Sequence, residues 1–552
     1  MCEYSLVRSR GDLLMELEQI SLPVSNALLA DYWSQDAVIH SFFDYKYNEQ
    51  SFVDRADYLQ TKQYDTKRLA GIIESYMGKF GIHEQAKQHL HELTDGALVV
   101  VGGQQAGVLT GPLYSVHKAI SVILLAREQR EKLQKPVVPM FWIAGEDHDL
   151  EEINHTFTIV QAETKKRGYS ERSKRKTMAS TTELNHAAME QFVRTVFKDF
   201  GETAYTEQIL ADILFRLKDS KTFTDFFTAL MNDFFGKHGL LLLDAADERF
   251  REYESSFFTA IIDNNEQIAQ LVVKQEQALT GAGYGIPIQA TEQNANLFYV
   301  RDGERFLLER NGDYFRNVLG HVKFTKEELL AVAEQSPEHL SNNVVTRPLM
   351  QEMTIPVLAF VGGPGELAYW ATLKPAFATL QLQMPIFAPR LNITMQTRQV
   401  QSMLEQHELT VKDVIAGKAE QLKQAFIDRV QDTEANRQIE HMQAELMQQY
   451  EGLLVYLQAQ QLDVEKTVEK NRAYHEMQFS YLRNKISQQV TNKHEVVIRQ
   501  FDTLQAELVP NGGYQERVYS PYQYLNVYGP TLIDDLLELP MSICAQHQVI
   551  SF

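Results

Sequence analysis

Residues 99–154 read VVVGGQQAGVLTGPLYSVHKAISVILLAREQREKLQKPVVPMFWIAGEDHDLEEIN, and this stretch decides the fold. An apolar strand ends in a glycine-rich turn, a helix follows, and a second apolar strand leads directly into Glu146, Asp147, His148 and Asp149. When a helix joins two parallel strands, the loops after both strands lie at the same edge of the sheet, where open α/β folds bind their ligands. We therefore expect the chemistry of this protein at that edge.

Further strand signals alternate with helical patterns along the chain. They occur at Val137–Ile143, Gly239–Leu243, Arg305–Leu308 and Val357–Gly362, after a first clear strand that begins at Leu98. Strands that alternate with helices predict an α/β fold with a mostly parallel, doubly wound sheet. The first ninety or so residues are predicted to be mostly helical, because apolar residues follow a helical spacing in Leu13–Leu17 and Leu69–Met77.

The chain of 552 residues is too long for one compact core, so more than one structural unit is expected. We assign residues 1–396 to the catalytic core, with insertions at about 161–238 and 266–323. Residues 397–509 are rich in Gln, Glu, Lys and Leu and almost free of Gly and Pro, which predicts an antiparallel helical coiled coil. The aromatic segment 510–552 is expected to pack back on the core.

The coiled-coil prediction depends on the spacing of apolar residues. These follow intervals of three and four, as in Met442, Leu446, Tyr450, Leu453 and Leu457. The pattern fails around Gln460–Asp463, which predicts two long helices folded back on each other. Paired helices of this length often present a second apolar stripe to another subunit, so we expect a homodimer through this hairpin.

Composition limits the classes of function. A net charge of −20 without an acidic tail argues against a general role at nucleic acids or membrane surfaces. The only cysteines, Cys2 and Cys544, form no metal or disulfide pattern, and no leader or membrane-spanning segment is recognised, so a cytoplasmic protein is expected. The basic run Lys165–Lys176 is interpreted as a solvated hairpin or loop of the insertion, with a phosphate-contacting flap as the alternative.

The glycine-rich turn is the first candidate site. Its glycines allow close approach of backbone N–H groups to an anion, and Pro112 suits the start of the following helix, whose N-terminus favours negative charge. The alternative is a sharp turn without a ligand. The candidates for substrate or anion binding are Gly103, Gln104, Gln105, Thr110, Gly111, Tyr114 and Lys118. His117 is a candidate catalytic residue, or alternatively a packed helix residue.

The acidic cluster is the second candidate site. Glu146, Asp147, His148 and Asp149 are candidate catalytic residues, since such a cluster can bind an amine or a divalent metal or transfer protons. Asn154 is a candidate substrate contact. The alternative is that these acids only cap the next helix. The HExxH spacing is absent, and we predict no metal site.

The third candidate site lies in residues 341–390, where another apolar strand leads into the turn GGPGE. Arginine offers bidentate recognition of carboxylate or phosphate. The candidates for substrate or anion binding are Arg347, Gly363, Gly365, Glu366, Tyr369, Trp370 and Arg390. The alternative is a structural turn with surface arginines.

Taken together, these segments resemble the bacillithiol-biosynthesis cysteine-adding enzymes of the BshC family. The resemblance is carried by GGQQAGVLTGPLYSVHK (102–118), PMFWIAGEDHDLEEINH (139–155), NNVVTRPLMQE (342–352), AFVGGPGELAYW (359–370) and FAPR (387–390), and by a late QER at 515–517. It covers essentially the whole chain.

The resemblance implies a Rossmann-like core with inserted connecting segments, similar to class I nucleotidyltransferases, and a coiled coil that supports dimerisation. It implies the last step of bacillithiol synthesis, in which cysteine is joined to glucosaminyl-malate by an amide bond. Because an amide does not form to completion in water unaided, ATP is the expected activating cofactor, at a site that the sequence does not assign. The alternative is a non-catalytic ligand-binding or scaffold protein of the same pathway.

Overall fold

The computed structural model describes residues 4–8, 14–22, 26–170, 177–431 and 433–552. The chain divides into two compact units. The first, here called the core unit, comprises Met1–Val160, Thr164–Gln396 and Gly513–Phe552. The second, here called the arm, comprises Gln161–Glu163 and Thr397–Gly512.

A five-stranded parallel sheet of order β14-β13-β3-β4-β7 forms the centre of the core unit. Its strands are β3 (Leu98–Gln104), β4 (Val137–Ile143), β7 (Leu241–Asp244), β13 (Val357–Gly362) and β14 (Ile386–Pro389). The chain first builds outward from β3 to β7 and then returns to β13 on the other side of β3. This reversal of strand order is typical of doubly wound folds, and it confirms the predicted Rossmann-like sheet.

Helices cover this sheet and explain its composition. Every residue of β4 and β13 is buried, as expected for parallel strands that have helices on their faces and no solvent side. Helix α6 (Leu113–Leu133) packs against β3 and β4, and α4 (Thr66–Met77) packs against β7. The prediction of a helix at Leu69–Met77 is therefore confirmed.

The connection between β4 and β7 contains helices and a hairpin. Its elements are α7 (Leu150–Ile153), β5 (His155–Val160), β6 (Glu163–Gly168), α8 (His186–Phe200), α9 (Thr206–Asp219) and α10 (Phe223–Phe235). Strand β6 includes the first residues of the basic run that begins at Lys165, which was interpreted as a hairpin or loop, and it pairs with β5. Residues 171–176 of that run lie outside the described residues.

The connection between β7 and β13 contains a separate antiparallel sheet of order β11-β10-β9-β8-β12. We call it the β8–β12 module. Its strands are β8 (Asn294–Arg301), β9 (Glu304–Asn311), β10 (Tyr314–Arg316), β11 (Lys323–Thr325) and β12 (Leu340–Asn342). It shares a second hydrophobic core with α11 (Glu248–Asp263) and α13 (Lys326–Gln335). Strand β9 contains the strand expected at Arg305–Leu308, and it lies within the insertion predicted at about 266–323 and outside the parallel sheet.

A third sheet joins the two ends of the chain, in the order β1-β2-β16-β15. It consists of β1 (Tyr4–Arg8), β2 (Leu14–Ile20), β15 (Ile393–Gln396) and β16 (His547–Ser551). The predicted helix at Leu13–Leu17 is thus wrong. Met15 and Leu17 are buried while Glu16 and Glu18 are half-buried, an alternation of period two that belongs to a strand and that neighbouring apolar residues obscured in the sequence.

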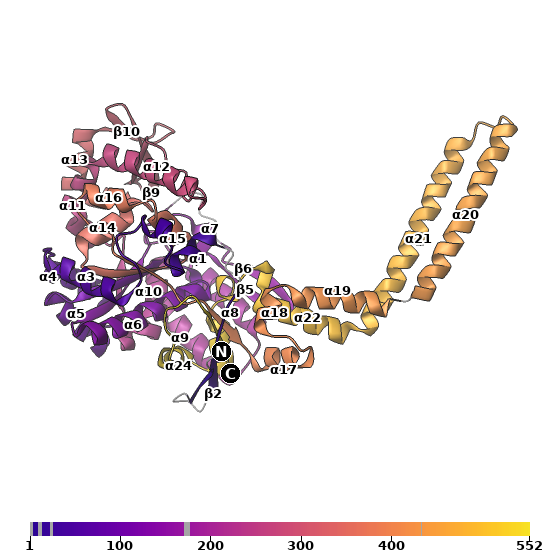
Figure 1. The fold of residues 1–552 in the computed structure, drawn as a ribbon, viewed down its shortest axis with the longest axis horizontal. Coiled ribbons are helices and arrows are strands. Elements are labelled where there is room, and N and C mark those ends of the chain that lie inside the picture. Colours follow the sequence, from indigo (N-terminus) through magenta and orange to yellow (C-terminus); the bar gives the residue numbers. More distant parts are fainter. Residues whose placement is uncertain (1–3, 9–13, 23–25, 171–176, 432) are drawn as a thin grey trace. The chain divides into compact units, whose positions relative to one another are not determined.

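The arm is helical in all the secondary structure described for residues 397–512. It begins with α17 (Arg398–Gln406), α18 (Val411–Ile415) and α19 (Lys418–Val430), continues with α20 (Thr433–Ala459) and α21 (Glu465–Lys493), and ends with α22 (Glu495–Leu508). Helices α20 and α21 run antiparallel beside each other (Figure 1). They are joined by residues 460–464, where the heptad pattern fails, so the structure agrees with the predicted hairpin.

After the arm the chain returns to the core unit through η5 (Gln515–Arg517), α23 (Tyr522–Tyr528), α24 (Leu532–Glu538) and β16. Strand β16 pairs in parallel with β15 and antiparallel with β2. None of the helices described is long and apolar enough to span a bilayer.

Candidate functional site

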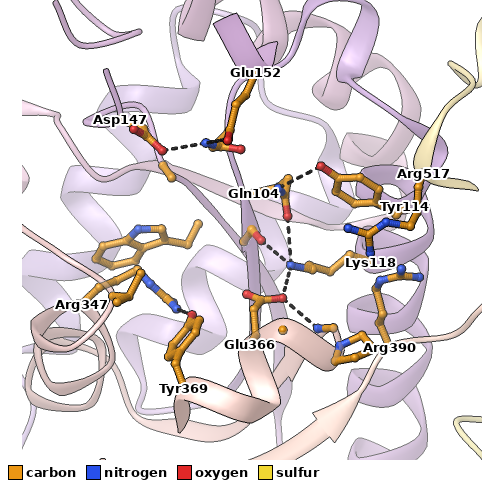
Figure 2. Close-up of a pocket in the computed structure, with 18 residues that line it drawn as sticks. Gln104, Tyr114, Lys118, Asp147, Glu152, Arg347, Glu366, Tyr369, Arg390 and Arg517 are labelled. Carbon is orange, nitrogen blue, oxygen red and sulfur yellow. Dashed lines mark hydrogen bonds and ion pairs between the residues drawn. The ribbon is translucent and has the colours of Figure 1, made fainter. Parts of the chain in front are cut away.

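A cavity of about 680 Å³ lies at the carboxyl ends of β3, β4, β13 and β14, where the strand order reverses (Figure 2). This is the position at which doubly wound folds bind ligands. Its walls come from the loops after these strands and from α6, α14 (Thr346–Thr354), α15 (Pro364–Trp370) and η5. The volume falls within the usual range of small-molecule sites, about 300–1,000 Å³.

The cavity brings together twelve of the residues predicted from the sequence. They are Gly103, Gln104, Gln105, Tyr114, Lys118, Asp147, Arg347, Gly363, Gly365, Glu366, Tyr369 and Arg390. They derive from three segments that are up to 287 residues apart, from Gly103 to Arg390, and the parallel sheet places them at one edge.

Lys118 joins the loops that follow β3 and β13. Its Nζ donates to the carbonyl of Gly103 at 2.7 Å, to Oε1 of Gln104 at 3.1 Å and to Oε2 of Glu366 at 2.6 Å. Burial lowers the pKa of Lys118, although the Glu366 carboxylate opposes this shift. Three acceptors match the three N–H bonds of an ammonium group, so Lys118 fixes the cavity wall as a charged, fully bonded side chain.

Arg347 and Arg517 provide positive charge without a carboxylate partner. The guanidinium of Arg347 donates to Oε1 of Gln351 at 3.0 Å and to the hydroxyl of Tyr369. Burial raises the pKa of Tyr369 to about 12, so this hydroxyl stays neutral. Arg517 lies 6.0 Å from the centre of the Tyr114 ring. Among the residues that the structure describes, no Asp or Glu forms an ion pair with Arg347 or Arg517, and both line the cavity.

Arg390 also lines the cavity, but its charge is compensated from behind. Its guanidinium forms a bidentate ion pair with Glu516, at 2.7 and 2.9 Å. Burial raises the pKa of Glu516, but Arg390 and the ring of His117 outweigh burial and hold it well below its usual range. Arg390 is therefore a rigid wall of the cavity, and less free to bind a ligand than Arg347.

The cavity also contains a pair of carboxylates, those of Asp147 and Glu152, which lie beside each other in Figure 2. The amide nitrogen of Gln105 donates to Oδ2 of Asp147 at 2.7 Å and to Oε2 of Glu152 at 3.0 Å. One amide thus holds two carboxylates beside each other. Such a pair attracts an ammonium group and can accept a proton from an amine. Within the described parts of the chain, no three His, Cys, Asp or Glu side chains are arranged to hold a metal ion.

The other members of the acidic cluster lie outside the cavity. Glu146 is buried, pairs with Arg251 and accepts the backbone N–H of Asn342 at 3.3 Å. The ring of His148 packs edge-on against Phe298, with the centroids 5.8 Å apart. In the short helix α7, Asp149 is the exposed N-cap residue, without a side-chain capping bond, and Asn154 is the C-cap residue. The structure thus differs from the expectation that all five residues face the ligand, because successive residues of a tight loop point in different directions.

The predicted anion site at the start of α6 also differs from the structure. The N–H of Leu113, the first residue of α6, donates to the carbonyl of Tyr519 at 2.8 Å, so it is not available to an anion. Thr110 is fully buried and has φ of 65°, and Gly111 does not line the cavity. The returning C-terminal segment therefore occupies the place that the sequence assigned to a ligand.

Two further predicted residues are part of the interior. His117 is buried and its Nδ1 lies 2.9 Å from Oε2 of Glu516, while burial lowers its pKa. Trp370 is buried and stacks on Phe360 with a centroid distance of 4.5 Å. Neither lines the cavity. The open alternative for His117 is thus resolved in favour of a packed helix residue.

Six lining residues were not among the candidates. They are Trp142, Ala144, Glu152, Val344, Pro364 and Arg517. Glu152 lies in the same acidic stretch as Asp147, and one helical turn separates its backbone from that of Asp149, so a search of the whole stretch would have included it. Arg517 is separated from the other segments by the arm, and only its membership of the QER motif marked it.

The parallel sheet with reversed strand order and the cavity lined by both acidic and basic residues define a Rossmann-like α/β protein with a small-molecule site at its switch point. Residues 15–391 match the family described as "Bacillithiol biosynthesis BshC, N-terminal Rossmann-like domain", and residues 393–552 match "Bacillithiol biosynthesis BshC, C-terminal coiled-coil domain". The chain belongs to the BshC family.

Relatives from several bacteria are similar over nearly the whole chain. A protein of Lysinibacillus sphaericus named "Putative cysteine ligase BshC" is 57% identical over 97% of this chain and 100% of its own length. Proteins of the same name from Geobacillus thermodenitrificans and Bacillus licheniformis are 37% and 36% identical, each over 97% of this chain and 100% of their own length.

Proposed function

We propose that this protein is an ATP-dependent ligase that joins the carboxyl group of cysteine to the amine of glucosaminyl-malate in the last step of bacillithiol biosynthesis. The family description and the names of the relatives support the pathway and the cysteine ligase activity. The observation that carries the proposal is the set of charged groups in one cavity. It holds a pair of carboxylates, Asp147 and Glu152, and two arginines, Arg347 and Arg517, that have no carboxylate partner among the described residues.

The charged groups of the cavity complement both parts of the proposed acceptor. Glucosaminyl-malate carries an amine at one end and two carboxylates at the other. Arg347 and Arg517 suit the carboxylates, because guanidinium groups bind them through two parallel hydrogen bonds. Asp147 and Glu152 suit the amine, which is attracted as an ammonium ion and reacts after it loses a proton.

Amide formation requires an activated carboxyl group. In the proposed reaction ATP phosphorylates or adenylates the cysteine carboxylate, and the amine nitrogen then attacks the activated carbonyl carbon. The bond from that carbon to the phosphate or adenylate oxygen breaks, and Asp147 or Glu152 accepts the proton that the nitrogen loses. Lys118 and Arg390 line the cavity as ion pairs with Glu366 and Glu516, so the positive charge available to the developing oxyanion is that of Arg347 and Arg517. We assign no nucleotide site.

The substitution Asp147→Asn tests the proposal, because it removes the charge while preserving the shape of the side chain. With glucosaminyl-malate, cysteine and ATP, product detected by mass is expected to form about 10²-fold more slowly, the usual effect of losing a general base. Asp149→Asn is the matched control, since Asp149 is an exposed acid of the same loop outside the cavity.

Equal activity of Asp147→Asn and the unmodified protein would contradict the assigned role. If the unmodified protein binds glucosaminyl-malate but forms no product under any of these conditions, the non-catalytic binding protein is the better description.

A further inference from the structure

We infer that Arg305 of the β8–β12 module is a positioning residue for Asp147. The strands of this module contribute no residue to the lining of the cavity. Through Arg305 the module nevertheless takes part in the function of the site. The inference rests on the proposed function, because it assigns Arg305 a role that acts through the carboxylate of Asp147. It concerns the same site and names a residue that does not touch the cavity.

The guanidinium of Arg305 is held on three sides. Its Nε donates to Oγ of Ser341 at 2.8 Å, its Nη2 donates to the carbonyl of Asn342, and its carbon lies 3.8 Å from the centre of the Phe298 ring. All these partners belong to β8 and β12. These contacts use two nitrogens and one face of the guanidinium, and they leave Nη1 directed at Asp147, whose Oδ1 is 4.0 Å away.

The carboxylate of Asp147 is thereby constrained through both oxygens. Oδ2 accepts from Gln105 at 2.7 Å, and Oδ1 accepts the backbone N–H of Asp149 at 3.2 Å and faces Arg305. Gln105 and Asp149 belong to the loops of the parallel sheet. Arg305 is the one described cation that forms an ion pair with Asp147 apart from the neighbouring ring of His148, and it comes from a different sheet.

Two other contacts anchor the same loop to the same module. Glu146 accepts the backbone N–H of Asn342 and pairs with Arg251 of α11, which packs on the module. His148 packs against Phe298, the ring that also carries Arg305. Three successive residues of the acidic loop therefore contact the module or its supporting helix. A loop held in this way presents Asp147 to the cavity in one orientation, which a reacting amine requires.

The surrounding charge explains why arginine is used. Burial lowers the pKa of Arg305, and Glu146 and Asp147 oppose this shift, so the cation is retained in a buried setting by the acidic loop that it holds. A neutral side chain at this position would leave the orientation of Asp147 to Gln105 and one backbone group. The carboxylate would then sample orientations in which its lone pairs miss the amine.

A double-mutant cycle tests the inference. We compare the unmodified protein, Arg305→Gln, Asp147→Asn and the double variant, measuring kcat and KM for glucosaminyl-malate and, by calorimetry, its Kd. If Arg305 acts through Asp147, Arg305→Gln lowers kcat/KM about tenfold, and the double variant is no more than twofold worse than Asp147→Asn alone. Arg305→Lys keeps the charge. On a logarithmic scale, its kcat/KM is expected to lie closer to that of the unmodified protein than to that of Arg305→Gln.

The matched control is Arg301→Gln. Arg301 belongs to the same hairpin as Arg305. Its guanidinium likewise lies over a phenylalanine ring, that of Phe306, and donates to the backbone carbonyl of His321. It forms no ion pair with the acidic loop among the described residues. It is expected to leave kcat/KM unchanged. A general loss of stability in the module would lower the activity of both variants, and comparison of their melting temperatures identifies it.

Three outcomes overturn the inference. If Arg305→Gln keeps kcat/KM within twofold while Asp147→Asn is impaired, Arg305 has no positioning role and the proposed function stands. If the two losses multiply in the double variant, Arg305 acts independently of Asp147. If Asp147→Asn is itself fully active, the role assigned to Asp147 fails first and the inference fails with it. If the unmodified protein forms no product, the Kd values of the four proteins for glucosaminyl-malate are compared in place of kcat/KM. They distinguish the same three outcomes.

Discussion

A buried carboxylate that is distant in sequence determines how Arg390 is presented to the cavity. Glu516 lies 126 residues after Arg390, yet it fixes both terminal nitrogens of that guanidinium and also accepts the N–H of Ile393 at 3.2 Å. Removal of one partner from a buried ion pair typically costs about 3–5 kcal/mol, because the other charge stays desolvated. The QER segment is therefore structural at Glu516 and lines the site at Arg517.

His547 gives a pH dependence that can be measured in this network. Burial lowers its pKa from 6.5 to about 4, against the opposing attraction of Glu516. The unfolded chain therefore binds a proton at His547 between pH 6.5 and 4 while the folded chain does not. Stability from this group is fully present above pH 6.5 and is lost as the pH falls. Between pH 7 and pH 5 the loss is about 2 kcal/mol.

The variant His547→Gln tests this contribution. It removes the titrating group and keeps a partner for the hydroxyl of Thr394, which lies 2.7 Å from Nε2 of His547. The free energy of unfolding, measured in urea, is compared at pH 7 and pH 5 for both proteins. The decrease from pH 7 to pH 5 is expected to be smaller in the variant than in the unmodified protein, by about 2 kcal/mol. Identical pH slopes for the two proteins would show that His547 titrates normally.

The sequence predicted correctly which segments meet at the cavity, and for some residues also which side chains line it. Lys118 and Glu366 were both candidates, and they meet because each follows a strand of the same parallel sheet. Arg517 was not a candidate, because the sequence predicts that residues 510–552 pack back on the core but not which of their side chains reach the edge of the sheet. His117 and Trp370 were selected for their chemistry, but the direction of a side chain on a helix depends on packing that the sequence alone does not specify.

At the scale of elements, the sequence was most informative for strands that are apolar along their whole length. Strands β4 and β13 have no competing interpretation. Strand β2 does, because its apolar residues fit spacings of both two and three, and the partner strand β16 that selects the first spacing is more than 500 residues away. Strand β9 was recognised as a strand, but its antiparallel partners decide its sheet, and pairing is not a local property.

The contact between β3 and β4 gives a prediction at this scale. A Cβ atom added to Gly103 would lie 2.4 Å from the carbonyl oxygen of Trp142, which is backbone of the neighbouring strand and cannot move alone. The substitution Gly103→Ala is therefore expected to lower the free energy of unfolding by about 1–3 kcal/mol, as overpacking does in well-packed interiors.

Gly71→Ala is the control, since Gly71 is exposed in helix α4 and nothing lies within 4 Å of its added Cβ. It is expected to stabilise the protein by up to about 1 kcal/mol through helix propensity. Urea unfolding of both variants provides the measurement. If the Gly103→Ala variant is as stable as the unmodified protein, the prediction is wrong. Strands β3 and β4 would then move apart more easily than their complete parallel pairing indicates.

At the scale of the whole molecule, the arm is an insertion within the core unit. The chain leaves the core unit after Gln396 and returns at Gly513. The side chain of Gln515 accepts from the backbone N–H of Met395 at 2.8 Å and donates to the carbonyl of the same residue at 2.9 Å. The two ends of the insertion are therefore held close together by contacts that belong to the core unit itself.

The surface of the arm supports the expected homodimer. Large apolar side chains of α20 and α21 remain exposed in the single chain, among them Val455 at 67%, Tyr456 at 60% and Met477 at 61%. Exposed apolar patches on a helical hairpin are typical of interfaces. The cavity, in contrast, is lined only by residues of the core unit, so its composition does not require the arm.

These two observations lead to a deletion experiment, in which a short Gly-Ser linker replaces residues 397–512. Because Gln515 and Met395 hold the two ends together, the shortened chain is expected to fold and to bind glucosaminyl-malate with a Kd within threefold of that of the full chain. Light scattering after gel filtration is expected to give a monomer for the shortened chain and a dimer for the full chain at the same concentration. A shortened chain that stays dimeric would place the interface in the core unit, and a folded monomer that no longer binds would mean that the arm or the second subunit completes the site.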